Sequence, residues 1–168
     1  QRLTALLNDY RAFARPQSVA VQPADLRQIF DEVLAPTIKY YDRKSIKVEL
    51  EFEQDLPLIP VDPEKIKQMI LNLCKNAVEA MSEGGILKCK GYQKANRVIL
   101  EVVDTGTGIP QDLEVFQLFK TTKPEGTGLG LPIVEQIVSE HRGTVKYISE
   151  AGKGTAFIVS LPLDVTGD

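Results

Sequence analysis

A long amphipathic segment at residues 62–83 constrains the fold more than any other part of the sequence. Asp62 is a good helix N-cap, Pro63 fits the first helical position, and Gly84-Gly85 ends the helical pattern. Apolar side chains recur at helical spacing on one face: Ile66, Met69, Ile70, Leu73, Ala77, Ala80 and Met81. This pattern predicts a helix from Asp62 to about Glu83 that packs against a second layer of structure.

The rest of the chain supplies strands and further helices. Strands are predicted at 45–53, 86–92, 97–104, 144–149 and 155–161, with the last two forming a hairpin around AGKG. Helices are predicted at 1–14, at 23–43 with Pro36 bending or splitting it, and at 131–142 with Gly143 as its stop. We therefore expect an α+β fold: a two-layer α/β sandwich in which helices cover one face of a mixed sheet, plus an N-terminal helix.

The composition excludes several classes of protein. At 168 residues, with 43% hydrophobic and 26% charged residues, the chain fits one globular domain. Its net charge of -3 argues against nucleic-acid or anionic-membrane partners, and no apolar run approaches the ~20 residues that span a bilayer. Cys74, Cys89 and His141 lack the spacing of a zinc site, which favours buried thiols in a reducing cytoplasm. Because the chain begins with Gln1, we expect a piece of a longer protein.

Three places have residues suited to binding or catalysis. The first is the edge of the 62–83 helix, where Asn72, Asn76 and Glu79 lie within a narrow arc. Asparagine is a poor helix former, and its amide oxygen coordinates hard cations or accepts hydrogen bonds. Two solvated asparagines on an exposed face would explain the pattern equally well.

The second place is the DTGTGIP stretch at 104–110, which follows a strand. Asp104 offers an acceptor-only carboxylate, while Gly106 and Gly108 let a ligand approach the main chain. An ordinary turn between elements is the alternative. The third is GTGLGL at 126–131, which fits neither the phosphate-loop nor the dinucleotide pattern. Its glycines before a helix still offer N–H groups to an anion.

Together, and in this order, these stretches resemble the ATP-binding domain of sensor histidine kinases, in the superfamily shared with DNA gyrase, MutL and a heat-shock chaperone. NLCKNAVEAM (72–81) is similar to the N box of that family, DTGTGIP to its first glycine box and EGTGLGL (125–131) to its second. VFQLFKTTK (115–123) is similar to the F box and GKGTAF (152–157) to the last glycine motif. The resemblance covers residues 22 to 163 and implies the Bergerat-type ATP-binding fold.

The resemblance implies roles for individual residues. Asp104 binds the adenine amino group with help from Thr155, and Asn76 holds Mg²⁺ near Asn72 and Glu79. The further nucleotide-binding residues that it implies are Gly106, Gly108, Ile109, Gly126, Thr127, Gly128, Leu129 and Gly130. Residues 111–125 correspond to a lid anchored by Phe116 and Phe119, in which Lys120 and Lys123 reach phosphate oxygens or remain solvated. We assign catalytic roles to Asn72, Asn76, Glu79 and Lys123.

One position separates the branches of the superfamily. Gyrase-like members carry a water-activating glutamate four residues before the Mg²⁺-binding asparagine, where this chain has Asn72. The resemblance therefore favours transfer of the γ-phosphoryl group to a protein histidine over hydrolysis. The alternatives are an ATPase of the gyrase–MutL type and a non-catalytic, nucleotide-gated interaction module.

The resemblance also implies how the parent protein is organised. Residues 1–15 resemble the end of the second dimerisation helix, 16–22 a linker, 23–163 the catalytic domain and 164–168 a tail. The phosphoacceptor histidine would lie upstream in a homodimeric parent that serves a cognate response regulator. We expect a cytoplasmic location and no membrane contact by this fragment. The RAFARP ending and the TTK of the lid are similar to nitrogen-regulation-type sensor kinases.

His141 is the only histidine in the chain, and we expect it to have no phosphoacceptor role. It follows the apolar stripe of the 131–142 helix and lies two residues before Gly143. A histidine at such a helix C-terminus caps carbonyl groups and interacts favourably with the helix dipole.

Overall fold

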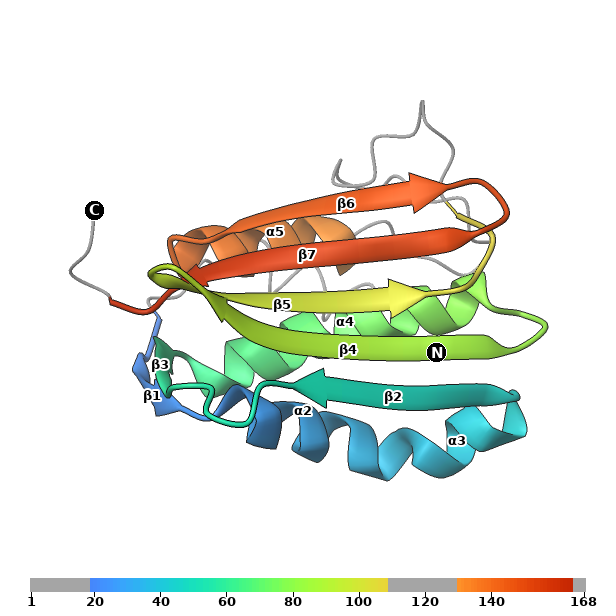
Figure 1. The fold of residues 1–168 in the computed structure, drawn as a ribbon, viewed down its shortest axis with the longest axis horizontal. Helices are drawn as coiled ribbons and strands as arrows, with labels where there is room; N and C mark the ends of the chain where they lie inside the picture. Colours follow the sequence, from blue (N-terminus) through green and yellow to red (C-terminus); the bar gives the residue numbers. More distant parts are fainter. Residues whose placement is uncertain (1–18, 109–129, 165–168) are drawn as a thin grey trace, which may run out of the picture.

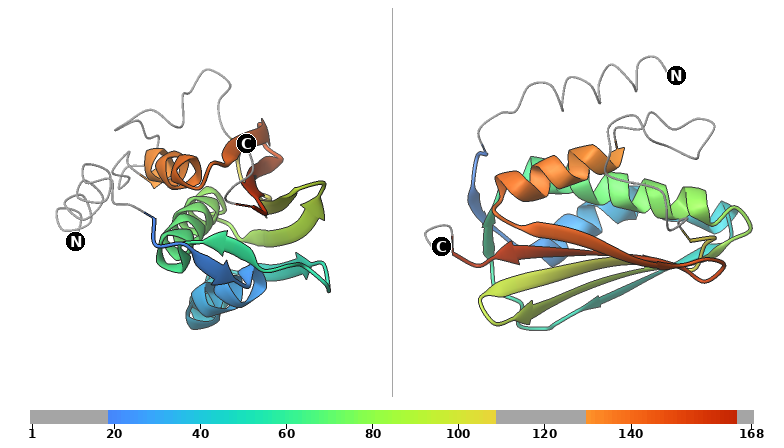
Figure 2. Two further views of the ribbon diagram at one scale, coloured as in Figure 1. Left: turned by 90° about the vertical axis from the view of Figure 1, so that its left-hand side faces the viewer. Right: turned by 90° about the horizontal axis from the view of Figure 1, so that it is seen from above.

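The computed structural model of the protein describes residues 19–108 and 130–164. Their main sheet has the strand order β2 (Ile46–Phe52), β4 (Gly85–Lys94), β5 (Arg97–Asp104), β7 (Gly154–Pro162) and β6 (Thr144–Glu150), shown in Figure 1. β2 runs parallel to β4, and the other neighbours are antiparallel. Figure 2 shows α2 (Leu26–Leu34), α4 (Pro63–Ala80) and α5 (Gly130–Glu140) on one face of this sheet. The predicted α+β sandwich is confirmed, whereas the predicted helix at 1–14 lies outside the described residues.

The hydrophobic core lies between the sheet and these helices. Alternate residues of β4, β5 and β7 point toward the helices and are buried: Leu87, Cys89, Val98, Leu100, Val102, Phe157, Val159 and Leu161. α4 meets them with the apolar face that its helical spacing predicts, and α5 adds Ile133, Val134, Ile137 and Val138. None of the described helices is long and apolar enough to cross a membrane.

α4 begins as predicted and ends earlier. The Asp62 carboxylate accepts hydrogen bonds from the N–H groups of Glu64 (3.1 Å) and Lys65 (3.4 Å), as an N-cap does. The last helical residue is Ala80 instead of the predicted Glu83. Met81 leaves the helical conformation, and the Ala80 carbonyl accepts a hydrogen bond from Thr107 in the loop after β5 (3.1 Å).

The predicted helix at 23–43 is split at the proline. α2 ends at Leu34, a short 3₁₀ turn spans Ala35–Thr37, and α3 covers Ile38–Arg43. The predicted start at Pro23 is wrong, because β1 (Gln22–Ala24) pairs with β3 (Ile59–Val61) and Asp25 caps α2. Both strands have three residues and contain a proline, so neither shows the alternation that marks a strand.

α5 also ends differently from the prediction. Its last residue is Glu140, and Arg142 takes the left-handed conformation (φ 59°) that the sequence suggested for Gly143. Gly143 is needed for space instead, since an added Cβ would collide with the carbonyl oxygen of Ser160. The sequence signal for the stop was correct, but the glycine lets the segment after α5 lie close against β7 and does not supply the left-handed residue itself.

Candidate functional site

Polar side chains replace apolar ones in the helix-facing row at one end of the sheet. There Asp104 of β5 pairs with Thr155 of β7, and Thr155 pairs with Ser149 of β6. Asp104 and Thr155 are each only 4% exposed, although the next helix-facing row is apolar or aromatic: Val102, Phe157 and Tyr147. A buried carboxylate acceptor beside a hydroxyl suits a ligand edge that offers both a donor and an acceptor.

The main chain around Asp104 is held by close packing and hydrogen bonds. The Oδ1 atom of Asp104 accepts a hydrogen bond from the N–H of Gly106 (2.8 Å), which holds the carboxylate against the loop that follows β5. An added Cβ at Gly106 would collide with the carbonyl of Ala80, and one at Gly154 would collide with the carbonyl of Asp104. Only glycine allows these approaches, so both glycines have a structural reason to be present.

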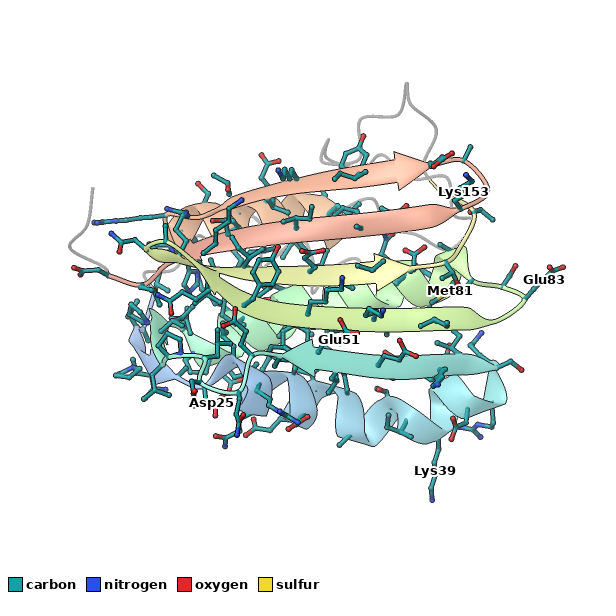
Figure 3. All side chains as sticks on the ribbon, viewed as in Figure 1. Asp25, Lys39, Glu51, Met81, Glu83 and Lys153 are labelled. Atoms are coloured by element: carbon teal, nitrogen blue, oxygen red, sulfur yellow. The ribbon has the colours of Figure 1, made fainter. Side chains whose placement is uncertain are left out.

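Thr105 connects this loop to two other elements. Its hydroxyl accepts a hydrogen bond from the N–H of Ile86 (3.1 Å) and donates to the sulfur of Met81 (3.7 Å). Figure 3 shows Met81 at the end of the sheet where β5 ends, the same end as Lys153 of the β6–β7 turn. Sequence reasoning missed both contacts, because Ile86 and Met81 lie 19 and 24 residues from Thr105.

The polar edge of α4 lies beside the start of α5. The side-chain amide of Asn72 donates to the carbonyl oxygen of Gly130, the first residue of α5 (3.4 Å). Asn76 is half-buried and Glu79 is exposed on the same helix. Thr107, in the loop that follows Asp104, is bonded to the end of α4. Within the described residues, α4 is therefore bonded both to the loop after β5 and to the first residue of α5.

Several predicted site residues lie outside the described residues: Ile109, Phe119, Lys120, Lys123, Gly126, Thr127, Gly128 and Leu129. Gly108 is described and has a positive φ of 82°, which favours glycine. Its neighbour Thr107 accepts a hydrogen bond from Gly152 of the β6–β7 turn (2.8 Å). The first and last predicted glycine motifs therefore contact each other directly.

Comparison with known proteins identifies the family. Residues 61–165 match the family described as Histidine kinase-, DNA gyrase B-, and HSP90-like ATPase. This chain belongs to that family. The match includes α4, the loop after β5 and the β6–β7 hairpin, which carry the polar residues described above.

Curated kinase relatives match nearly the whole chain. Sensor histidine kinase ZraS of Escherichia coli is 32% identical over 98% of this chain and 36% of its own length. Sporulation kinase C of Bacillus subtilis is 36% identical over 97% of this chain and 39% of its own length. The chain spans less than two fifths of either relative, and the nitrogen-regulation subtype stays a prediction.

Solved structures of the same family share the fold. Full-length ShkA in complex with AMPPNP has a TM-score of 0.86 and 28% identity, covering 95% of this chain and 35% of that one. The catalytic domain of histidine kinase ThkA has a TM-score of 0.80 and 30% identity, covering 87% of this chain and 97% of that one. ThkA in complex with response regulator TrrA has a TM-score of 0.85 and 25% identity, covering 99% of this chain and 49% of that one.

His141 lies apart from the polar row in this member of the histidine kinase-like family. It is buried, and its ring nitrogens contact the carbonyl of Ile137 in α5 (2.7 Å) and the N–H of Asp62 before α4 (3.0 Å). The predicted capping of α5 carbonyls is confirmed. The contact with Asp62 was not predicted, because it joins residues 79 positions apart.

Proposed function

We propose that this chain binds MgATP and transfers its γ-phosphoryl group to a histidine of an upstream dimerisation domain. In this function it is the catalytic half of a sensor histidine kinase in two-component signalling. The observation that carries the proposal is the buried Asp104–Thr155 pair at the end of β5 and β7, within a chain of this ATPase family. The AMPPNP complex of the similar protein ShkA supports nucleotide binding.

Asp104 accepts the exocyclic amine of adenine in this proposal, and Thr155 binds the adjoining edge. The carboxylate is already oriented by the Gly106 N–H, so little ordering is required when the nucleotide binds. The phosphates would extend toward Asn72, Asn76 and the start of α5 at Gly130, whose N-terminal end favours anions. Gly106, Gly108, Ile109, Gly126, Thr127, Gly128 and Leu129 complete the proposed nucleotide site.

The donor set of α4 fits Mg²⁺. Amide oxygens are hard ligands, and Mg²⁺ in proteins is commonly shared between one or two side chains and substrate phosphates. We assign this role to Asn76, with Asn72 and Glu79 beside it. When bound, Mg²⁺ neutralises phosphate charge. Phe119, Lys120 and Lys123 remain proposed lid residues, with Lys123 acting on the transferred phosphate.

Phosphoryl transfer is favoured over hydrolysis by the contact of Asn72. Its amide donates to the Gly130 carbonyl and joins α4 to α5, so this position serves in positioning and supplies no carboxylate base. The acceptor would be water only if another base were present. The proposed parent is a homodimer of cytoplasmic catalytic domains, where ATP is available, and it serves a response regulator, as ThkA is seen with TrrA.

Calorimetric titration with ADP and with the ATP analogue AMPPNP in Mg²⁺ tests the binding step. We expect Asp104→Asn to weaken both ligands about 10-fold or more, because it replaces an acceptor with a group that also donates. Asp55→Asn, in the exposed turn after β2 at the opposite end of the sheet, is the matched control. Equal affinity of Asp104→Asn and the parent would refute the adenine assignment.

A separately supplied acceptor hairpin tests the transfer step. Radiolabelled γ-phosphate should move from ATP to its histidine in the presence of the chain. Rapid phosphate release without labelled hairpin, lost in Asn72→Ala, would instead support the gyrase–MutL alternative. Binding without transfer or release would support a nucleotide-gated interaction module.

A further inference from the structure

Ser149 stands directly behind Thr155, on the side away from Asp104. It belongs to the edge strand β6 and is the ladder partner of Thr155. Its Oγ lies 2.9 Å from Oγ1 of Thr155 and 3.2 Å from the carbonyl oxygen of Gly154. Asp104, Thr155 and Ser149 thus form one row across three neighbouring strands.

The direction in which the Ser149 hydroxyl donates its proton constrains the direction in which the Thr155 hydroxyl donates. Each hydroxyl has one proton, and two of the acceptors within reach of Ser149 are the Gly154 carbonyl and Thr155 Oγ1. When Ser149 donates to Gly154, the short contact requires Thr155 to donate to Ser149, and Thr155 offers only lone pairs to a ligand. When Ser149 donates to Thr155, the Thr155 proton is directed elsewhere. The direction of the Ser149 hydroxyl therefore influences whether Thr155 meets a ligand as an acceptor or as a donor.

The two purines require opposite behaviour from this hydroxyl. Adenine presents an amine, which donates to the acceptor-only Asp104, beside N1, which is an acceptor. Guanine presents its O6 oxygen where adenine has the amine, and an N1–H where adenine has the unprotonated N1. The guanine oxygen would therefore face the Asp104 carboxylate. A Thr155 hydroxyl that donates matches adenine, and one that accepts does not.

We propose that Ser149 is a positioning residue for adenine recognition: its hydroxyl donates to Thr155 when nucleotide binds, and this directs the Thr155 proton to adenine N1. The proton reaches N1 directly or through one ordered water, and the donor direction is the same in both cases. The inference rests on the proposed binding of adenine at Asp104. It adds a residue on a third strand that contacts no nucleotide atom itself.

The test compares ADP with 1-deaza-ADP, in which N1 is replaced by a C–H group. Dissociation constants are measured for the parent chain, Ser149→Ala and Ser149→Thr, which keeps the hydroxyl on a residue suited to strands. We expect Ser149→Ala to weaken ADP about 5-fold, because Thr155 then lacks the donor that strengthens its own hydroxyl as a donor and orients its proton toward the ligand. The same variant should leave the affinity for 1-deaza-ADP unchanged, and Ser149→Thr should bind ADP within about 2-fold of the parent.

A merely structural role of Ser149 predicts equal weakening of both ligands, and that result would overturn the inference, as would unchanged ADP binding. Ser149→Cys, which replaces the hydroxyl with a weak donor of similar size, serves as a second variant if Ser149→Ala unfolds. Failure of the proposed function has a different signature: ADP would not bind the parent chain, or Asp104→Asn would not weaken it.

Discussion

The main-chain N–H of Asp62 donates a hydrogen bond to Nε2 of His141 (3.0 Å), joining the start of α4 to the end of α5. This contact fixes the tautomer, because Nε2 must be the unprotonated nitrogen and Nδ1 then donates to the Ile137 carbonyl (2.7 Å). The Asp62 carboxylate also accepts a hydrogen bond from Ala20 (3.0 Å). Asp62 and His141 therefore connect the start of α4, the end of α5 and the segment at Ala20.

His141→Ala should lower the free energy of unfolding by about 3 kcal/mol, because it leaves buried polar groups unsatisfied and creates a cavity. Urea denaturation measures this loss, with the exposed Lys146→Ala as a control. Asn76 lies about 20 Å along α4 from Asp62, so ADP affinity of the folded variant should stay within about 2-fold. A folded His141→Ala chain that binds ADP normally but no longer transfers phosphate would contradict a structural role.

Thr105→Val and Thr105→Ser form a matched pair at the loop after β5. Valine keeps the shape but removes the hydroxyl that bonds to Ile86 and Met81, whereas serine keeps it. We expect Thr105→Val to lower the free energy of unfolding by about 1 kcal/mol. It should also weaken ADP about 3-fold because Asp104 is the adjacent residue. Thr105→Ser should resemble the parent in both measurements; equal behaviour of the two variants would show that the hydroxyl has no part in holding the loop.

The contacts of Thr105 and His141 show where sequence reasoning reached its limit. Helix and strand periodicity predicted α4, β2, β4, β5 and the β6–β7 hairpin, because each has one buried face with a regular repeat. Motif order predicted which stretches belong to one site. The β1–β3 pair and the Asn72–Gly130 bond were missed, since short or irregular segments have no periodicity and tertiary contacts depend on packing.

Gly106→Ala should destabilise the chain, because the added methyl group collides with the Ala80 carbonyl at the end of α4. We expect a loss of about 2 kcal/mol in the free energy of unfolding, typical of overpacking, together with weaker ADP binding. Gly130→Ala is the control for stability alone, because its added Cβ meets no atom within 4 Å among the described residues outside its own helix backbone and chain neighbours. That variant should be as stable as the parent or slightly more stable. Similar losses in both would mean that helix or loop entropy, and not the collision, determines the effect.

Cys74 and Cys89 should report unfolding through their reaction with a thiol reagent. Both are buried, as the sequence suggested, and a hydrogen bond with Cys89 together with burial raises the pKa of the Cys74 thiol well above its usual range. Reaction therefore requires opening of the core. ADP at ten times its dissociation constant should slow labelling about 10-fold, because it binds only the folded state. The same labelling is measured in Cys89→Ser, which leaves Cys74 as the reacting thiol. Rapid labelling of either native protein would contradict this protection.

Tyr92 and Glu101 should make stability depend on alkaline pH. The Tyr92 hydroxyl donates to the Glu101 carboxylate (2.6 Å) on the sheet face away from the helices, and this bond, with burial, raises the pKa of Tyr92 to about 12. In the unfolded chain the pKa is about 10. The folded state thus holds the proton more tightly, so the contribution to stability is complete below pH 10 and is lost as the pH rises toward 12. The difference in unfolding free energy between the parent and Tyr92→Phe should therefore shrink across this range. Glu101→Gln should bring the pKa of Tyr92 down, as followed by tyrosinate absorbance, and an unchanged titration in that variant would show that the Glu101 charge does not cause the shift.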